Sequence, residues 1–360
     1  MTLPRWASIA PVVPQRWEDL SAAWFTKALR RDHPDAIVDK VTLIDADSGT
    51  NRRARFELDY LRGEGPRRVF LKAHAASHRW VHLRNGNLFL ESRLFASGAN
   101  LPLEHPHVYL AVPDYPRLDF LLVMEDLALR GAEPCTALHP LTLDQAKSGL
   151  RGLAALHRAY WNMGPRTHRK LGWVKQWAPS QGWQVGLRKR VPIGLTRSGD
   201  ELSPQLRKLT GDQVVDLWAT NVATLASGHQ TLLHGDAHLS NIYILPDDTA
   251  GFLDWQVVRR GNWIQDVGYF LIGALTVEDR RANERNLLEL YLEALDLPAA
   301  DRPGWSEAWL RYRQSPAYGL AIWLSTLGTD GWQPHEVSRA LNERYGAAMV
   351  DLESIKALSG

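Results

Sequence analysis

The sequence contains very little cysteine, no long apolar run and almost no excess of charge. Its 360 residues include a single cysteine, Cys135, which excludes an intramolecular disulfide and a cysteine-cluster metal site. No stretch approaches the roughly 18 consecutive apolar residues of a membrane span, and the first residues lack the basic segment and apolar run of a signal peptide. We therefore expect a cytoplasmic protein that binds no membrane.

The charges of the chain nearly cancel, because 42 basic and 40 acidic residues leave a formal net charge of +2. This balance gives no global reason to expect binding to nucleic acid. Hydrophobic content of 45% and charged content of 23% are ordinary for a soluble globular chain. The length exceeds the usual size of a single hydrophobic core, so we expect two lobes or two domains.

The polar stretch at residues 234–241 is the most informative part of the sequence. Short apolar segments at 230–233 and 242–245 flank it, which indicates a loop between two strands. A further short strand is expected at 251–253. Because adjacent short strands deliver their ends to one edge, three polar side chains should lie close together. They are Asp236, Asn241 and Asp254.

This trio suits phosphoryl transfer, which needs a carboxylate that orients an attacking hydroxyl and oxygen ligands that hold Mg²⁺ against nucleotide phosphates. An Asp followed five residues later by Asn has the spacing of a kinase catalytic loop. Gly235 stands where protein kinases carry Arg, so we expect no activation by phosphorylation of the short segment after Asp254. The competing interpretation is a capped turn without chemistry, since Gly tolerates positive φ and Asp bonds nearby backbone amides.

The triplets His234-Gly235-Asp236 and Asp254-Trp255-Gln256, with Asn241, resemble the aminoglycoside phosphotransferase and choline kinase superfamily. The second triplet and the stretch at residues 153–161 are similar to its ecdysteroid kinase-like branch. The resemblance implies a role for each of five residues. Asp236 would be the catalytic base, Asn241 and Asp254 would bind Mg²⁺, His234 would support the loop, and Asp266 would tie the region together.

Apolar segments joined by short turns predict an antiparallel sheet in the first third of the chain. Its strands are expected at residues 41–46, 54–61, 68–73, 108–112 and 120–124. A helix over residues 16–33 should pack on this lobe. Small residues in the first turn would let backbone amides approach the phosphates of a nucleotide, although one glycine between strands is usually only a hairpin turn. These residues are Ser48, Gly49 and Thr50.

Lys72 ends an apolar strand, and a lysine on the buried side of a sheet needs a partner. Glu91 lies in an apolar helical stretch further along the chain and would supply it, as in the kinase Lys–Glu pair that orients Lys toward the α- and β-phosphates. Alternatively, both side chains face solvent. The superfamily resemblance implies a hinge at the acidic segment that follows the last strand, with backbone groups from Glu125 to Leu127 bonding the purine of ATP or GTP.

Residues 160–210 carry ten Lys or Arg residues against two acidic ones, interleaved with tryptophans. Such a mixture can bind single-stranded nucleic acid, but a solvated insertion whose tryptophans pack on the lobe is the simpler interpretation. A third possibility is that the segment walls an acceptor pocket. A basic, tryptophan-containing wall would favour an apolar, flat or negatively charged acceptor over a polycationic aminoglycoside.

Helical periodicity dominates the second part of the chain. Helices are expected at residues 143–161, 267–275, 283–295, 306–327 and 335–357. The predicted fold is a two-lobed, protein-kinase-like α+β structure. Its N-lobe, residues 1–127, would bind nucleotide with an antiparallel sheet plus helix, and its mainly helical C-lobe, residues 128–360, would carry the catalytic loop and the acceptor site.

The predicted function is transfer of the γ-phosphoryl group of ATP or GTP to a hydroxyl of a small molecule, with Mg²⁺ required. An apolar, polycyclic or macrolide-like acceptor is favoured. Partners are therefore the nucleotide and the acceptor, without nucleic acid or membrane. The alternative is a pseudokinase or regulatory module that binds nucleotide without turnover.

Overall fold

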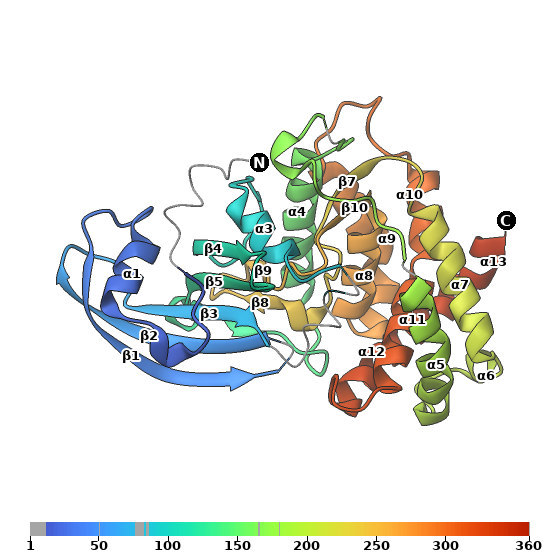
Figure 1. Ribbon diagram of the computed structural model, residues 1–360. Coiled ribbons are helices and arrows are strands. Elements are labelled where there is room, and N and C mark those ends of the chain that lie inside the picture. The colour runs from blue at the N-terminus through green and yellow to red at the C-terminus, as the bar shows by residue number, and fades with distance from the viewer. Residues whose placement is uncertain are drawn as a thin grey trace. The chain divides into compact units, whose positions relative to one another are not determined.

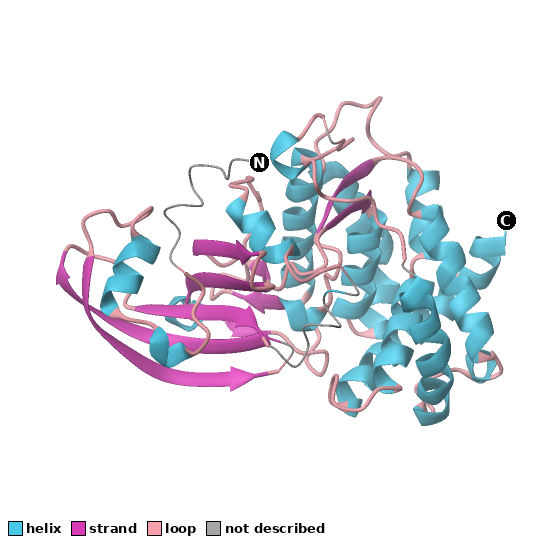
Figure 2. Cartoon of the chain, in the orientation of Figure 1, coloured by secondary structure: helices cyan, strands magenta, loops and turns pink. Residues whose placement is uncertain are grey.

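The computed structural model describes residues 12–49, 51–75, 83, 86–164, 166–179 and 181–359. The chain divides into two compact units. The first contains residues up to Asn100, then His105–Ala132 and Trp255–Val257. The second contains Leu101–Glu104, Glu133–Asp254 and the chain from Val258 onward. The architecture is α+β, as the sequence predicts, with an antiparallel sheet in the first unit and mainly helices in the second (Figures 1 and 2).

The first unit is built on a five-stranded sheet in which every neighbouring pair is antiparallel. The strand order is β1-β2-β3-β5-β4. The strands are β1 (Ile37–Ser48), β2 (Asn51–Arg62), β3 (Arg68–His74), β4 (Val108–Asp114) and β5 (Asp119–Glu125). All five strands were expected from the sequence, but β1 and β2 extend further at both ends. Their long hairpin stays paired from Ser48↔Arg52 to Ile37↔Arg62, with shifts in register along it.

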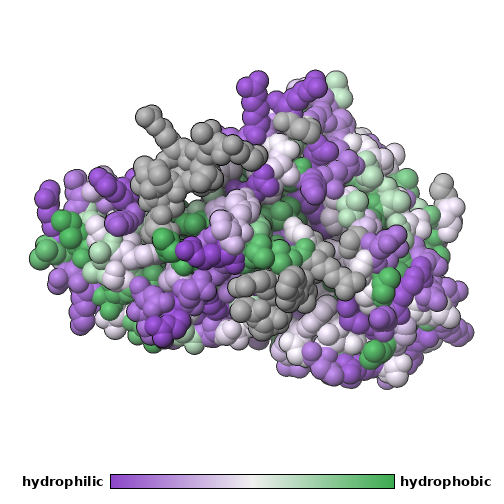
Figure 3. Space-filling view, viewed as in Figure 1, coloured by the Kyte–Doolittle hydropathy of each residue, from purple (hydrophilic) through white to green (hydrophobic). Residues whose placement is uncertain are grey.

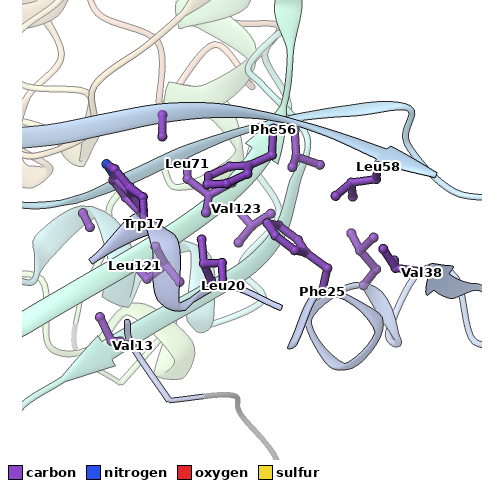
Figure 4. Packing of buried hydrophobic residues seen from close by; sticks show 14 residues of the cluster. Val13, Trp17, Leu20, Phe25, Val38, Phe56, Leu58, Leu71, Leu121 and Val123 are labelled. Carbon is purple, nitrogen blue, oxygen red and sulfur yellow. The ribbon is translucent and has the colours of Figure 1, made fainter. Parts of the chain in front are cut away.

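Strand β5 divides the core of this unit between the two faces of the sheet. Successive strand side chains point to opposite faces, so Leu121 and Val123 join the cluster around Phe25 and Phe56 (Figure 4). Residues that alternate with them join the second cluster, against which Phe95 of helix α3 (Leu90–Ala96) packs. The residues that β5 supplies to this second cluster are Phe120, Leu122 and Met124.

The helix expected over residues 16–33 is shorter than predicted. A 3₁₀ turn, η2 (Trp17–Asp19), comes first, and helix α1 (Ala22–Leu29) begins only after Leu20 takes an extended conformation. Ser21 caps α1, because its side chain accepts a hydrogen bond from the backbone of Trp24. The apolar spacing identified a packed segment, but the serine cap decides where the helix starts.

The second unit contains two small β-ladders. One has the order β6-β8-β9 and the other pairs β10 with β7, all antiparallel. Their strands are β6 (Glu133–Pro134), β7 (Gln230–Leu233), β8 (Ile242–Ile244), β9 (Ala250–Phe252) and β10 (Arg259–Asn262). The strands on either side of the polar stretch at 234–241 therefore belong to different ladders.

Helices supply the rest of the second unit. They are α4 (Leu143–Ala159), α5 (Gln181–Arg197), α6 (Pro204–Arg207), α7 (Gly211–Thr224), α8 (Ile264–Ala274), α9 (Val277–Ala294), α10 (Trp305–Gln314), α11 (Pro316–Leu327), α12 (His335–Asp351) and α13 (Ser354–Ser359). The single helix expected over 306–327 is two helices, because Pro316 has no N–H to continue the ladder and starts α11 instead. The helix expected over 335–357 is also interrupted, at Glu353, where φ is +47°.

The basic segment at 160–210 takes part in this helical packing. Leu187, Val191 and Gly194 of α5 are buried, and a Cβ atom added at Gly194 would lie 1.9 Å from the backbone oxygen of Leu324 in α11. Helix α5 therefore packs into the second unit along one face, and its contact with α11 needs a residue without a side chain.

Polar side chains cover most of the face seen in Figure 3, and apolar ones form separate small patches. In the part of the chain that the structure describes, no helix has both the length and the apolar composition needed to span a membrane.

Candidate active site

The polar stretch that follows β7 is tied to the end of the β8–β9 ladder. Ile242 pairs with Phe252, and one residue beyond this pair the backbone N–H of Leu253 donates to the carbonyl of Asn241, over 2.7 Å. Asp254 follows directly, in the left-handed region at φ +59°. The ladder therefore delivers Asn241 and the residue before Asp254 to the same end.

Asn241 also reaches back to the loop. Its side-chain amide donates to the backbone oxygen of Asp236 over 2.9 Å and lies 3.3 Å from the Oδ2 atom of the same residue. The structure thus joins Asp236 to Asn241 directly and brings Asn241 to Asp254 through the ladder. The spacing predicts the contact between Asp236 and Asn241, and Asp254 directly follows the residue bonded to Asn241.

The carboxylate of Asp236 is partly open, with 32% of its side chain exposed. Burial by itself would raise its pKa, but nearby cationic and hydrogen-bonding groups outweigh this and hold the pKa below its usual range. His238 is the main one, with Nε2 at 3.6 Å from Oδ2, and Arg259 contributes further. Asp236 is therefore ionised at neutral pH, as an acceptor of a proton must be.

Asp266 holds the entrance of the loop from helix α8. Its two carboxylate oxygens accept hydrogen bonds from successive backbone groups, the N–H of His234 at 2.7 Å and the N–H of Gly235 at 2.8 Å. Gly235 adopts φ +87°, a conformation that favours glycine. His157, fully buried, lies 3.3 Å from the same carboxylate through Nε2 and 2.7 Å from the hydroxyl of Tyr291 through Nδ1.

The ring of His234 spans the loop from the inside. Nε2 lies 2.8 Å from the carbonyl oxygen of Leu253, and the backbone N–H of Asp236 donates to Nδ1 over 3.3 Å. These partners assign the ring proton to Nε2. Burial lowers the pKa of His234, so the ring stays neutral and can serve as donor and acceptor at once.

The residues at the end of the ladder fit a divalent cation. Asn241 uses its amide nitrogen on Asp236, which leaves its side-chain oxygen directed to no described donor, and Asp254 supplies a carboxylate. Oxygen donors are those that Mg²⁺ prefers, and Mg²⁺ commonly takes only one or two protein ligands beside substrate phosphates. Among the described residues, no group of three or more His, Cys, Asp or Glu side chains suited to a metal occurs.

In the first unit, Lys72 of β3 and Glu91 of α3 form a buried ion pair. The distance from Nζ to Oε2 is 2.7 Å, and the two residues are only 7% and 4% exposed. The other carboxylate oxygen of Glu91 accepts a hydrogen bond from the backbone N–H of Trp255 over 3.2 Å. The solvent-facing interpretation of these two residues is therefore wrong.

The other described residues predicted to contact nucleotide lie at or just beyond strand ends of the same unit. Ser48 ends β1 and is exposed, as is Gly49, whose N–H donates to the carbonyl of Asn51 over 2.9 Å. Thr50 lies outside the described residues. Glu125 ends β5 and its side chain accepts from the backbone of His107, while Leu127 begins the 3₁₀ turn η4 (Leu127–Arg130).

Two residues near Asp236 were not identified from the sequence. His238 could have been, because it lies only two positions after Asp236 in the loop. Arg259 could not, because its link to the loop depends on the pairing of β10 with β7: its Nη2 donates to the carbonyl of Gly235 over 2.6 Å. A lone arginine in a strand gives no signal of such a contact.

Comparison with solved structures identifies proteins whose fold resembles that of this chain. The spectinomycin phosphotransferase APH(9)-Ia, solved with ADP and spectinomycin, is 13% identical, covers 93% of this chain and 99% of its own, and gives a TM-score of 0.51. A Ralstonia eutropha protein provisionally named an aminoglycoside phosphotransferase is 14% identical, with 91% and 98% covered and a TM-score of 0.53. A microcompartment-associated aminopropanol kinase is 18% identical, with 89% and 94% covered and a TM-score of 0.50.

Sequence comparison adds a narrower match. Residues 195–300 match the Ecdysteroid kinase-like family. No curated protein sequence matched the chain. As the motifs indicate, the chain shares its kinase-like fold with these solved phosphotransferases, and residues 195–300 resemble the Ecdysteroid kinase-like family.

Proposed function

We propose that this protein is a small-molecule kinase that transfers the γ-phosphoryl group of ATP or GTP to a hydroxyl of its acceptor. The observation that supports this best is the arrangement in the second unit, where the partly exposed Asp236 is hydrogen-bonded to Asn241 at the ladder end that continues into Asp254. A base beside two oxygen ligands is the arrangement that phosphoryl transfer to an alcohol requires.

In this proposal the acceptor oxygen forms a bond to the γ-phosphorus while the bond to the β–γ bridging oxygen breaks, so that nucleoside diphosphate leaves. Asp236, ionised at neutral pH, orients the hydroxyl and accepts its proton. Asn241 and Asp254 would hold Mg²⁺, which neutralises charge on the phosphates. His234 and Asp266 keep the loop in place, so the base is positioned before the acceptor binds.

The first unit would bind the nucleotide. Lys72, aligned by Glu91, would contact the α- and β-phosphates, the turn at Ser48, Gly49 and Thr50 would cover them, and the backbone near Glu125 and Leu127 would bond the purine. The buried Lys72–Glu91 pair supports this assignment, because an ion pair so shielded from water holds the ammonium in one place.

We propose an apolar, polycyclic or macrolide-like acceptor rather than a polycationic aminoglycoside. The support is chemical: the segment at 160–210 is basic and carries tryptophans, so it would repel a polycation and accept a flat apolar face. A panel of hydroxylated polycyclic compounds, macrolides and aminoglycosides, each assayed for nucleotide consumption, tests this. Turnover of aminoglycosides alone would contradict it.

The function itself is tested with Asp236→Asn, which keeps the shape of the side chain but removes its ability to accept a proton. We expect turnover to fall by about 10² to 10⁴, the usual contribution of a general base, with nucleotide binding retained. Asp296→Asn, at an exposed carboxylate paired with Arg158, is the control and should be fully active. Nucleotide binding without any turnover across the panel would instead identify a pseudokinase or regulatory module.

A further inference from the structure

Arg259 is a buried cation that the proposed reaction does not use. It is 4% exposed, and its register opposite Leu233, the last residue of β7, directs it toward the start of the loop. Its Nη2 atom donates to the carbonyl of Gly235 over 2.6 Å and to the hydroxyl of Tyr318 over 3.1 Å. The guanidinium is therefore held one residue away from Asp236.

Most of the hydrogen-bonding capacity of this guanidinium is left over. Its Nε and Nη1 atoms are buried and donate to no described residue, and no described carboxylate forms an ion pair with it. A buried charge normally has an opposite charge or a full set of hydrogen bonds, because removing it from water is costly. Arg259 lacks both, so it is a preformed binding group for an anion.

An aromatic ring covers the same guanidinium. The Cζ atom of Arg259 lies 4.3 Å from the centroid of Trp177, which comes from the basic segment at 160–210 and is only half-buried. Trp177 in turn contacts the buried Trp218 and the half-buried Trp183 edge to face, with centroids 6.2 and 6.4 Å apart. An anion bound at Arg259 would thus lie beside a partly open aromatic surface.

We propose that Arg259 binds a negatively charged group, a carboxylate or its equivalent, on the acceptor, and that Trp177 receives the flat apolar part to which this group is attached. This inference rests on the proposed function. It narrows the acceptor to a molecule that carries an acidic group close to the hydroxyl that is phosphorylated. The positive charge of Arg259 also acts on Asp236, whose pKa it lowers. The same charge would offset the repulsion between the carboxylate of Asp236 and an acidic group on the acceptor.

Benzoate is a suitable probe, with benzamide as the neutral compound of the same shape. In calorimetric titrations without nucleotide, we expect the wild-type protein to bind benzoate about tenfold more tightly than benzamide or better, as a hydrogen bond from a charged group implies. Arg259→Gln should abolish this preference. Arg285→Gln is the matched control, because Arg285 stacks on Trp309 at 4.2 Å but is exposed and lies in α9. It should leave the preference unchanged.

Several results would overturn the proposal. Equal affinity for the two probes, or an unchanged preference in Arg259→Gln, would remove the anion site. If Arg259→Gln does not fold, wild-type crystals soaked in 4-bromobenzoate test the proposal instead. Anomalous scattering from bromine locates the ring of the bound compound, and a ring found away from Trp177 would contradict the assignment. Weakened ATP binding in Arg259→Gln, with no benzoate preference in the wild type, would show that Arg259 serves nucleotide phosphate instead.

These titrations need neither nucleotide nor turnover. A protein that binds benzoate through Arg259 but consumes no nucleotide would contradict the proposed kinase function and leave the anion site standing. A protein that turns over only neutral acceptors and shows no preference for benzoate would contradict the anion site and leave the proposed kinase function standing.

Discussion

The side-chain amide of Asn241 donates a 2.9 Å hydrogen bond to the backbone carbonyl of Asp236. This bond ties the proposed base to the end of the β8–β9 ladder, five residues further along the chain. It also fixes the orientation of Asn241, because the amide nitrogen must face Asp236 and the side-chain oxygen must face away. This hydrogen bond therefore positions the proposed base, Asp236, and also orients the proposed metal ligand, Asn241.

Asn241→Asp tests this double role without any activity assay. The variant loses the donor to the Asp236 carbonyl and places a second carboxylate beside the first, so we expect the free energy of unfolding at neutral pH to fall by about 1–3 kcal/mol. Urea denaturation measures it. Asn283→Asp, which removes a similar 2.9 Å amide-to-carbonyl bond at an exposed site, should change stability by no more than about 0.5 kcal/mol.

A double-mutant cycle on Lys72 and Glu91 should report strong coupling. Removing one partner, as in Lys72→Met or Glu91→Gln, leaves the other buried without this ion pair, and we expect each change to cost about 3–5 kcal/mol. The double variant should cost less than the sum of the singles. The exposed pair Lys147 and Asp144, at 2.8 Å, is the control, with an expected coupling of about 0.2–1 kcal/mol. Additive single effects at Lys72 and Glu91 would contradict the buried pair.

Asp266 should make the stability of the protein depend on acidic pH. Burial alone would raise its pKa, but the hydrogen bond and charge of His157 and the backbone donors outweigh this and lower the pKa below the ordinary value of about 3.9. A carboxylate whose pKa is lowered on folding stabilises the protein above its unfolded pKa, and this contribution is lost as the pH falls through the folded pKa.

The comparison of wild type with Asp266→Asn measures that contribution. The difference in unfolding free energy should be largest near neutral pH, by about 3 kcal/mol for two bonds to a charged acceptor, and should shrink below about pH 4. Denaturation curves across this range give the difference directly. A difference that is constant with pH would mean that Asp266 is not ionised in the folded protein.

Gly194 should be intolerant of a side chain. A Cβ atom there would meet the backbone of Leu324 at 1.9 Å, and backbone cannot move aside as a side-chain end can. We therefore expect Gly194→Ala to destabilise by about 3 kcal/mol, at the upper end of overpacking costs. In the same helix, Gly186→Ala meets only the end of the Arg190 side chain and should be neutral or stabilising by up to about 1 kcal/mol. Equal effects would show that α5 and α11 do not approach closely.

Local pattern made the fold class and the outline of the site predictable. Apolar segments marked the five strands of the sheet. In β5 the apolar run is continuous from Phe120 to Met124, because both faces of this strand are packed. The spacing from Asp236 to Asn241, followed by a hairpin ending at Asp254, fixed their neighbourhood, because short antiparallel pairing leaves few geometries.

Contacts between distant segments were decided only in three dimensions. The stacking of Trp177 on Arg259 joins residues far apart in the chain, and the carboxylate of Asp266 reaches His234 from another helix. The break at Pro316 and the packing of α5 likewise depend on what each segment meets. The periodicity of apolar residues indicates which side of a helix or strand is buried. It does not indicate which residues that side contacts, because these contacts are set by the packing of the whole unit.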